Sequence, residues 1–448
     1  MHEARVSIGG KSVWTIVVYA ASAAIRFLTN IILTRLLAPE ILGVVVIAQA
    51  IRTGAELLTD MGMEQNVVHS PHGDDERFLN TVWTLQILRG IAIAAVTIFA
   101  AYAVSRFYRV DTAVLVAMSA APFLNSLAST SIFSLSRHLE VKTKNLFELA
   151  SEAAGLIINV TLALWLHSVW APIMGILATL AVRSAASYLL PHQRHRLLLD
   201  RTFGQAIFEF SKWVMLSSLM LFGAVYADRL FLGHVASLAV LGIYGLARAL
   251  SDVPSMLATR LAMQIVFPTV AKDQTRADAA ARTGLARTRR YVLLLFAVGI
   301  ATVMAWSDWT VRLLYDVRYE QAGWMLFLLL ASSWFAVLAW FGEAKMLGHG
   351  MPRSVGVANA IRLAVMMGGL VAGFSLLGLP GAVLALPASE LARYGILRVA
   401  QRGLPNTFAL QDALFTLGFL ALLIAWVTIR VSLGLGVPWA LMPHAWPA

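Results

Sequence analysis

The chain has 448 residues, of which 59% are apolar and only 13% are charged, whereas soluble globular domains are about 45–50% apolar and about 25% charged. This composition excludes an ordinary water-soluble protein, which would need more charge to coat its cores. Cysteine is absent, which excludes disulfides, thiolate metal sites and cysteine nucleophiles. The formal charge of +11 is expected of a membrane protein whose cytoplasmic loops collect Lys and Arg.

Apolar stretches of membrane-spanning length recur along the whole chain. A helix needs about 20 residues to cross roughly 30 Å of hydrocarbon, because each residue rises about 1.5 Å. The sequence therefore predicts an all-α polytopic membrane protein with about thirteen transmembrane helices, a twelve-helix core and one extra helix at the carboxyl end. In chain order the predicted spans are residues 13–33, 41–62, 79–104, 112–133, 146–166, 170–190, 207–235, 238–267, 291–306, 321–347, 354–376, 380–397 and 413–429. Residues 430–448 contain three prolines and are too short and broken to predict a fourteenth span.

The distribution of basic residues predicts which side of the membrane each connection faces. Lys and Arg are enriched in cytoplasmic loops. With the amino terminus inside, nineteen basic residues fall in internal connections and six in external ones, and the other ten of the 35 lie within or at the ends of spans. We therefore expect the amino terminus in the cytoplasm.

The two halves of the chain share an internal repeat. An ungapped shift of 199 positions aligns Ser12 with Ser211, Trp14 with Trp213, Leu33 with Leu232, Leu42-Gly43 with Leu241-Gly242, and Ala48 with Ala247. Each half then contains six spans, and since six is even, both halves start on the same side of the membrane. The sequence thus predicts two parallel six-helix bundles, over residues 1–190 and 207–400, with a cytoplasmic linker over 191–206 and an extra segment and tail over 401–448. Transporters built from such repeats keep their sites between the halves.

Five arginines fall inside predicted spans, where a guanidinium facing lipid is expensive. They are Arg26, Arg89, Arg229, Arg248 and Arg362. Each would cost about 2.5–3.5 kcal/mol at the bilayer centre, so we expect them to line a wet, cationic cavity between the halves. Guanidinium groups in such a cavity attract an anion, especially a phosphate that accepts two parallel hydrogen bonds. These five are the candidate substrate-binding residues.

A structural alternative is that each arginine pairs with a carboxylate and only holds helices together. Helical spacing favours this for Arg52 with Glu56 and for Arg248 with Asp252. The candidate arginines without an acidic residue within one turn are Arg26, Arg89 and Arg362. That absence favours a ligand-facing position, and for Arg89 the main rival is snorkelling to an interface.

Four further polar residues within spans are candidates for coupling or gating: Asn30, Arg52, Glu56 and Asp228. Asp228 lies beside Arg229 in the outer part of its span, where a protonatable acid could respond to ligand or ion; the alternative is an electrostatic partner in a network. No cofactor or metal is predicted, because the ten histidines form no His-Glu-x-x-His pattern. The histidine-containing acidic loop at residues 69–76 is predicted to be a solvated polar loop.

Three stretches of the chain resemble a known family. Residues 34–50 read TRLLAPEILGVVVIAQA, residues 56–68 read ELLTDMGMEQNVV, and residues 241–272 read LGIYGLARALSDVPSMLATRLAMQIVFPTVAK. With the span order and the duplication, they resemble the Wzx-type polysaccharide flippases of the multidrug/oligosaccharidyl-lipid/polysaccharide (MOP) exporter superfamily. The resemblance implies two six-helix bundles forming a V around a central cavity with alternating access. Arg26 and the pair Asp228-Arg229 match by position the cavity-lining residues of related flippases.

The resemblance also implies a cargo and a location. An undecaprenyl-diphosphate-linked oligosaccharide would move from the cytoplasmic to the periplasmic leaflet of the bacterial inner membrane, for assembly of exopolysaccharide, capsule or O-antigen. Membrane lipids, a polysaccharide polymerase and export machinery are the implied partners, and nucleic acid is not. Three alternatives stay open: a lipid-linked peptidoglycan precursor flippase, a drug/cation antiporter of the same superfamily, and a membrane glycan polymerase or ligase. The last would need an external catalytic region, but the longest external connection lies around residues 307–320, so we expect no enzyme.

Overall fold

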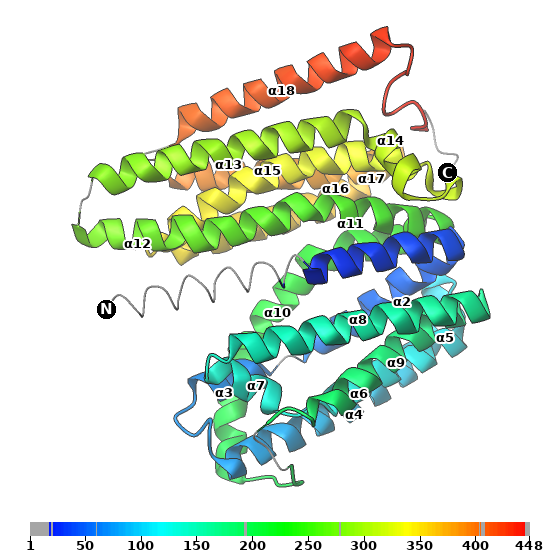
Figure 1. The fold of residues 1–448 in the computed structure, drawn as a ribbon, viewed down its shortest axis with the longest axis vertical. Helices are drawn as coiled ribbons and strands as arrows, with labels where there is room; N and C mark the ends of the chain where they lie inside the picture. Colours follow the sequence, from blue (N-terminus) through cyan, green and yellow to red (C-terminus); the bar gives the residue numbers. More distant parts are fainter. Residues whose placement is uncertain are drawn as a thin grey trace. The chain divides into compact units, whose positions relative to one another are not determined.

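The computed structural model describes residues 18, 21–59, 61–191, 195–276, 279–402, 404 and 408–443. Within these residues every regular element is a helix (Figure 1). A first helix over residues 21–36 is followed by α2 (Pro39–Leu58), α3 (Met63–His69), α4 (Glu76–Tyr108), α5 (Thr112–Met118), α6 (Ala120–Ser126), α7 (Ser131–Arg137), α8 (Val141–Leu166), α9 (Trp170–Ser187) and α10 (Arg201–Val235). The chain continues with α11 (Leu238–Leu261), the π-helical turn η1 (Ala262–Val266), α12 (Phe267–Arg276), α13 (Ala279–Ala305), α14 (Ser307–Leu314), the 3-10 turn η2 (Val317–Tyr319), α15 (Ala322–Gly348), α16 (Pro352–Leu377), α17 (Leu379–Ala400) and α18 (Ala409–Ser432).

The predicted spans fall on these helices, several of which run past the predicted ends. The first span, predicted over residues 13–33, begins outside the described residues, and its described part lies in the helix over 21–36. In the part of the chain that the structure describes, eight helices are long and apolar enough to cross a membrane, or nine if one bent pair is a single span. The protein is therefore a multi-span membrane protein. The number thirteen stays a prediction, since α10, α11 and α17 are not among those eight.

The span predicted over residues 112–133 is broken rather than continuous. Its helices α5 and α6 are followed by α7, which is bent by 52° relative to them. A break inside a membrane frees main-chain carbonyls that need another donor. The amide of Gln86 on α4 supplies it, because Nε2 donates to the carbonyls of Ser126 at 2.7 Å and Ala128 at 3.1 Å. The break was not predicted, since its stabilising donor lies about 40 residues earlier in the chain.

Aspartate side chains cap the amino-terminal ends of the α-helices α4, α5 and α10. The carboxylate of Asp75 accepts from the amide of Arg77 at 2.8 Å at the start of α4, and Asp111 does the same for Ala113 at 2.9 Å in α5. Asp200 accepts from Thr202 at 2.9 Å at the start of α10. Each side chain satisfies one of the amides that a first helical turn leaves without a partner.

The chain divides into two compact units, residues 1–242 and 243–448. In the first unit α8 packs on α9, α2 on α10, and α6 on both α4 and α9. In the second unit α15 is largely buried and packs against α13, α14 and α17, while α18 runs beside α13 (Figure 1). The predicted bundle boundaries at residues 190 and 207, and the V around a central cavity, stay predictions.

The segment predicted as a linker, residues 191–206, is attached to α4 over residues 195–200, and residues 201–206 already form the start of α10. Three alternate amides donate to polar side chains of that helix: Arg196 to Asn80 at 2.9 Å, Leu198 to Thr84 at 3.0 Å and Asp200 to Thr81 at 3.2 Å. Residues 192–194 of the predicted linker lie outside the described residues. This extended segment is therefore fixed to the first unit by main-chain hydrogen bonds before α10 begins.

Two glycines aligned by the 199-residue shift approach each other within the first unit, Gly43 on α2 and Gly242 near the start of α11. A Cβ atom on Gly43 would lie 1.9 Å from the carbonyl oxygen of Leu238, and one on Gly242 would lie 2.1 Å from that of Pro39. Pro39 and Leu238 are themselves related by the same shift, so the contact is reciprocal. Neither position has room for a side chain, which explains why the repeat retains glycine at both.

Candidate functional site

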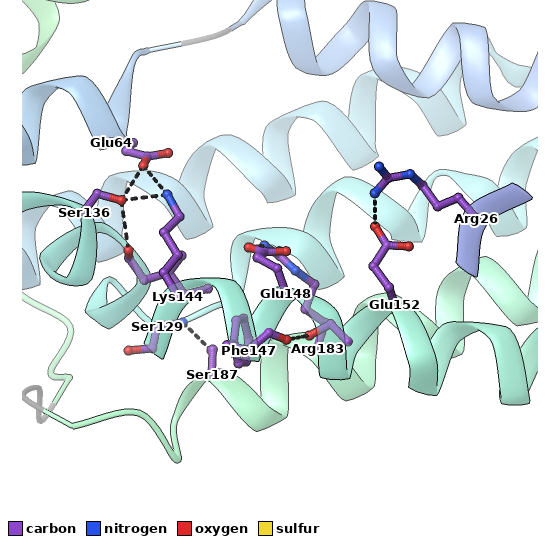
Figure 2. A network of polar contacts seen from close by, with 12 residues as sticks. Arg26, Glu64, Ser129, Ser136, Lys144, Phe147, Glu148, Glu152, Arg183 and Ser187 are labelled. Carbon is purple, nitrogen blue, oxygen red and sulfur yellow. Dashed lines mark hydrogen bonds and ion pairs between the residues drawn. The ribbon is translucent and has the colours of Figure 1, made fainter. Parts of the chain in front are cut away.

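A polar stripe follows one face of α8 in the first unit. Lys144, Glu148 and Glu152 are spaced four residues apart, which places them on the same side of the helix. Each reaches a different neighbouring element, as Figure 2 shows. We call these three residues and their partners Glu64, Arg183 and Arg26 the α8 ladder.

The first step of the α8 ladder joins α8 to α3 and α7. Lys144 Nζ donates to Glu64 Oε1 at 2.7 Å, and the hydroxyl of Ser136 donates to the same oxygen at 2.7 Å. Lys144 Nζ also donates to Ser136 Oγ at 2.6 Å. The carboxylate thus accepts from both a cation and a hydroxyl.

The other two steps are arginine–glutamate pairs between different helices. Arg183 of α9 donates from Nη2 to Glu148 Oε1 at 2.8 Å, and its guanidinium lies 5.8 Å from the ring centroid of Phe147. Arg26, in the helix over residues 21–36, donates from Nη1 to Glu152 Oε1 at 2.6 Å. The side chains of Arg26 and Glu152 are 44% and 31% exposed, so this pair is open to a ligand or to water.

Two cavities lie on either side of the Glu148–Arg183 pair. One has a volume of about 360 Å³ and is bordered by α2, α3, α4, α6, α7, α8 and α9. The other has a volume of about 320 Å³ and is bordered by the helix over residues 21–36, α8 and α9. Glu148 and Arg183 line both. Among the described residues, the charged groups of the two walls are Arg26, Arg89, Lys144 and Arg183 against Glu56, Glu64, Glu148 and Glu152. Four cations face four carboxylates, and the combined lining is neutral.

Four residues selected from the sequence lie in these walls. Arg26 and Asn30 line the smaller cavity, and Glu56 and Arg89 line the larger one. Arg89 donates from Nε to Thr59 Oγ1 at 3.2 Å and from Nη2 to the main-chain oxygen of Glu56. Its guanidinium is thus turned toward α2.

The pairs that helical spacing favoured are formed. Arg52 lies 3.4 Å from Glu56, and Arg248 lies 3.2 Å from Asp252. These contacts are those expected of the structural alternative, and the binding role of Arg248 and the coupling or gating role of Arg52 stay predictions.

Arg26 and Arg362 also have carboxylate partners, although their own helices provide none. Arg26 pairs with Glu152, as described above, and Arg362 Nε lies 2.6 Å from Glu390 Oε1 on α17. The partners lie on neighbouring helices, so the spacing along one helix could not reveal them. Three of the five candidate arginines, Arg26, Arg248 and Arg362, thus pair with carboxylates. Arg26 and Arg89 line polar cavities of the first unit, and the predicted cationic cavity between the halves stays a prediction.

The pair Asp228-Arg229 lies on α10, away from the lining of the two cavities. Asp228 is buried, and its carboxylate accepts from the amide of Arg229 at 2.8 Å. The guanidinium of Arg229 donates to the carbonyl of Val225 at 3.1 Å and lies 5.2 Å from the ring centroid of Tyr226. The structure therefore does not bring this pair together with the α8 ladder.

Lys144, Arg183 and Glu64 were not selected from the sequence. The four-residue spacing of Lys144, Glu148 and Glu152 was a usable signal, because charges on one face of an apolar helix need polar neighbours. Arg183 lies in the interior of the predicted span 170–190 and could have been found by depth alone.

The described residues contain no group of three or more His, Asp or Glu side chains arranged to hold a metal ion. In the loop predicted to be polar, Asp74 pairs with Arg137 at 2.9 Å. Arg137 Nη1 also donates to the carbonyls of Val67, Val68 and Ser70 at 2.8–3.0 Å. Arg137 thus binds both the acidic side chain of the loop and the main chain at the end of α3.

The fold is shared with solved transporters of the MOP superfamily. The structure of the lipid II flippase MurJ in an inward closed conformation matches with a TM-score of 0.74 at 11% identity, over 94% of this chain and 96% of MurJ. An inward-facing multidrug resistance MATE family transporter of the MOP superfamily matches with a TM-score of 0.62 at 14% identity, over 90% of this chain and 99% of the transporter. The chain is therefore an all-helical membrane protein with the MOP fold.

The family follows from the sequence comparison. Residues 32–323 match the family described as polysaccharide biosynthesis protein, and the chain belongs to that family. The succinoglycan biosynthesis transport protein ExoT of Rhizobium meliloti (strain 1021) is 21% identical over 292 residues, which are 65% of this chain. The match spans 57% of the relative's length.

Proposed function

We propose that this protein is a flippase that moves a lipid-linked oligosaccharide, carried on undecaprenyl diphosphate, from the cytoplasmic to the periplasmic leaflet of the bacterial inner membrane. The observation that carries the proposal is the pair of polar, partly open cavities among apolar helices of the first unit, in a chain of the polysaccharide biosynthesis protein family. A lipid-linked saccharide needs such a polar space, because its hydroxyl groups would otherwise lose hydrogen bonds in hydrocarbon. The lipid tail stays in the bilayer.

Transport by this proposal requires no covalent chemistry. Two bundles rock about the substrate and open the cavity to either side in turn. An interior-negative membrane potential favours outward movement of an anion by about 2.3 kcal/mol per uncompensated charge per 100 mV, so coupling to an ion is not required. A polysaccharide polymerase and export machinery would take up the product.

Of the arginines selected from the sequence, we assign the diphosphate to Arg229, which lies away from the lining of the two cavities. A guanidinium suits a diphosphate because it offers parallel N–H donors and keeps its charge at any physiological pH. The guanidinium of Arg229 donates to the main-chain carbonyl of Val225, a bond that a phosphate oxygen can replace with a stronger, charge-assisted one.

Export by arginine variants tests this function. Arg229→Ala and Arg26→Ala each remove a contact to the cargo, and a charged hydrogen bond of about 1.5–3 kcal/mol corresponds to a roughly 10- to 100-fold loss of affinity. We expect polysaccharide export to fall by a similar factor while the protein remains inserted. The matched control is Arg106→Ala, because Arg106 is exposed near the end of α4 and bonds only to Tyr102 among the contacts described.

Leaflet assays of a deletion strain distinguish this function from its rivals. We expect a lipid-linked intermediate to accumulate in the inner leaflet, and full export by both arginine variants would contradict the assigned residues. A peptidoglycan precursor flippase would instead rescue a strain depleted of that essential activity. The likeness to MurJ at 11% identity supports only the shared fold.

A further inference from the structure

The two cavities of the first unit have a charge pattern that does not suit a diphosphate. The cations Lys144, Arg183 and Arg26 each lie within 2.8 Å of a carboxylate oxygen, from Glu64, Glu148 and Glu152 in turn. A dianion entering this space gains no net attraction from a neutral lining, and it comes close to several fixed negative charges. The pairs would have to be broken before any of the cations could bind it.

The same pattern suits an uncharged sugar ring. A sugar hydroxyl is both a donor and an acceptor, so it can donate to a carboxylate and accept from a guanidinium at the same time. Neutral polar side chains complete the lining: Gln65, Gln86, Asn125, Ser126 and Ser129 in the larger cavity, and Thr29, Asn30, Ser151, Asn159 and Thr179 in the smaller one. These groups again offer both donors and acceptors.

The geometry of the α8 ladder provides room for more than one ring. Successive steps are four residues apart, which is about 6 Å along the helix axis. The cavities of about 360 and 320 Å³ fall at the lower end of the usual range of about 300–1,000 Å³ for pockets that hold small organic ligands. The side chains of Glu148 and Arg183 are 37% and 27% exposed, so both are accessible from the cavities that they separate.

We infer that the α8 ladder and its two cavities are the saccharide site of the flippase, which binds the uncharged sugar rings of the cargo, and that the diphosphate is bound outside them. This inference rests on the proposed function. It names Glu148 and Arg183 as the central sugar-binding residues, and it separates them from Arg229, which serves the diphosphate.

Two probes measured on purified protein in lipid nanodiscs test the separation. One is undecaprenyl diphosphate without sugar. The other is the oligosaccharide released by mild acid from the lipid-linked intermediate that accumulates in the deletion strain. In Glu148→Gln we expect the affinity for the oligosaccharide to fall by about tenfold, because a charge-assisted hydrogen bond becomes a neutral one. The affinity for undecaprenyl diphosphate stays within about twofold of wild type, because that group binds elsewhere.

The opposite result would overturn the inference. If the ladder bound the diphosphate, removal of the Glu148 charge would leave Arg183 free to bind it, and undecaprenyl diphosphate would bind more tightly to Glu148→Gln than to wild type. Unchanged affinity for the oligosaccharide would equally refute a sugar site here. The matched control is Glu76→Gln, a loss of one carboxylate from an exposed position at the start of α4, which should change neither affinity.

Failure of the proposed function is recognised separately. A wild-type protein that binds neither probe, together with a deletion strain that still presents the intermediate in the outer leaflet, overturns the flippase function and the saccharide site with it. A wild type that binds and translocates the cargo, while Glu148→Gln keeps full affinity for the oligosaccharide, overturns only the saccharide site.

Discussion

Both units contain arginine–glutamate pairs within their membrane helices, and the pairs differ in their surroundings. In the first unit, the side chains of Arg183 and Glu148 are 27% and 37% exposed and border two cavities. In the second unit, Arg393 is 1% exposed and lies between Glu343, at 2.5 Å, and Glu390, at 3.2 Å. The same residue types are therefore accessible in one unit and buried in the other.

The buried arginine joins three helices of the second unit. Arg393 of α17 reaches Glu343 on α15, and Glu390 beside it also binds Arg362 of α16 at 2.6 Å. The guanidinium of Arg393 lies 4.3 Å from the ring centroid of Trp340. Its neighbours are buried protein groups, so we expect this network to hold helices together, whereas the proposed saccharide site requires the pairs of the α8 ladder to exchange partners with a ligand.

The largest effect on stability is expected from Arg393→Met. The variant removes the arginine that pairs with Glu343 and leaves Glu390 with Arg362 alone, and breaking a buried pair in this way typically costs about 3–5 kcal/mol. We expect a large drop in the midpoint of thermal unfolding in detergent. A loss below about 1 kcal/mol, the value of a surface ion pair, would show that the network is hydrated and would remove the contrast between the units.

A smaller effect is expected from Arg430→Met, at the other end of the second unit. Arg430 uses all five of its N–H donors: two on Asp308 at 2.5 Å, and one each on the carbonyls of Ala305, Leu435 and Gly436 at 2.8–3.1 Å. The side chain of Asp308 is already 12% exposed beside Arg430, so water can partly solvate its carboxylate in the variant. We expect a destabilisation of about 2–3 kcal/mol, below that of Arg393→Met.

Thermal unfolding of an exposed pair provides the control for both variants. Arg312 pairs with Glu320 outside the long helices, and its side chain is 52% exposed. Arg312→Met should change stability by less than about 1 kcal/mol. An effect of Arg430→Met that does not exceed this control would contradict the role assigned to Arg430.

Much of the fold could be predicted from the sequence because a membrane helix is encoded locally. Length and apolarity place the helices, and the repeat of Leu42-Gly43 in Leu241-Gly242 indicates the duplication. The mutual contact of the two glycines could not be predicted, since a shift of the sequence on itself aligns residues without placing them in space.

The site was predicted only in part, for the same physical reason. Depth in a span selected Arg26 and Arg89, which line the two cavities. Their partners depend on how helices pack, and the pairing of Arg26 with Glu152, 126 residues away, is a property of the tertiary structure. A surplus of cations in the sequence therefore did not imply a cationic lining in the first unit.

The smallest effect on stability, and the sharpest test of the comparison, is expected from Arg183→Met. Because both partners of the Arg183–Glu148 pair are about one-third exposed, water can replace the lost contact, and the loss should be about 0–1 kcal/mol. Export should nevertheless fall strongly, since the variant removes a donor shared by both cavities. The opposite pattern, a protein that unfolds as readily as Arg393→Met but exports normally when it is folded, would show that the α8 ladder only holds helices. The contrast between the two units would then lie in hydration alone and not in function.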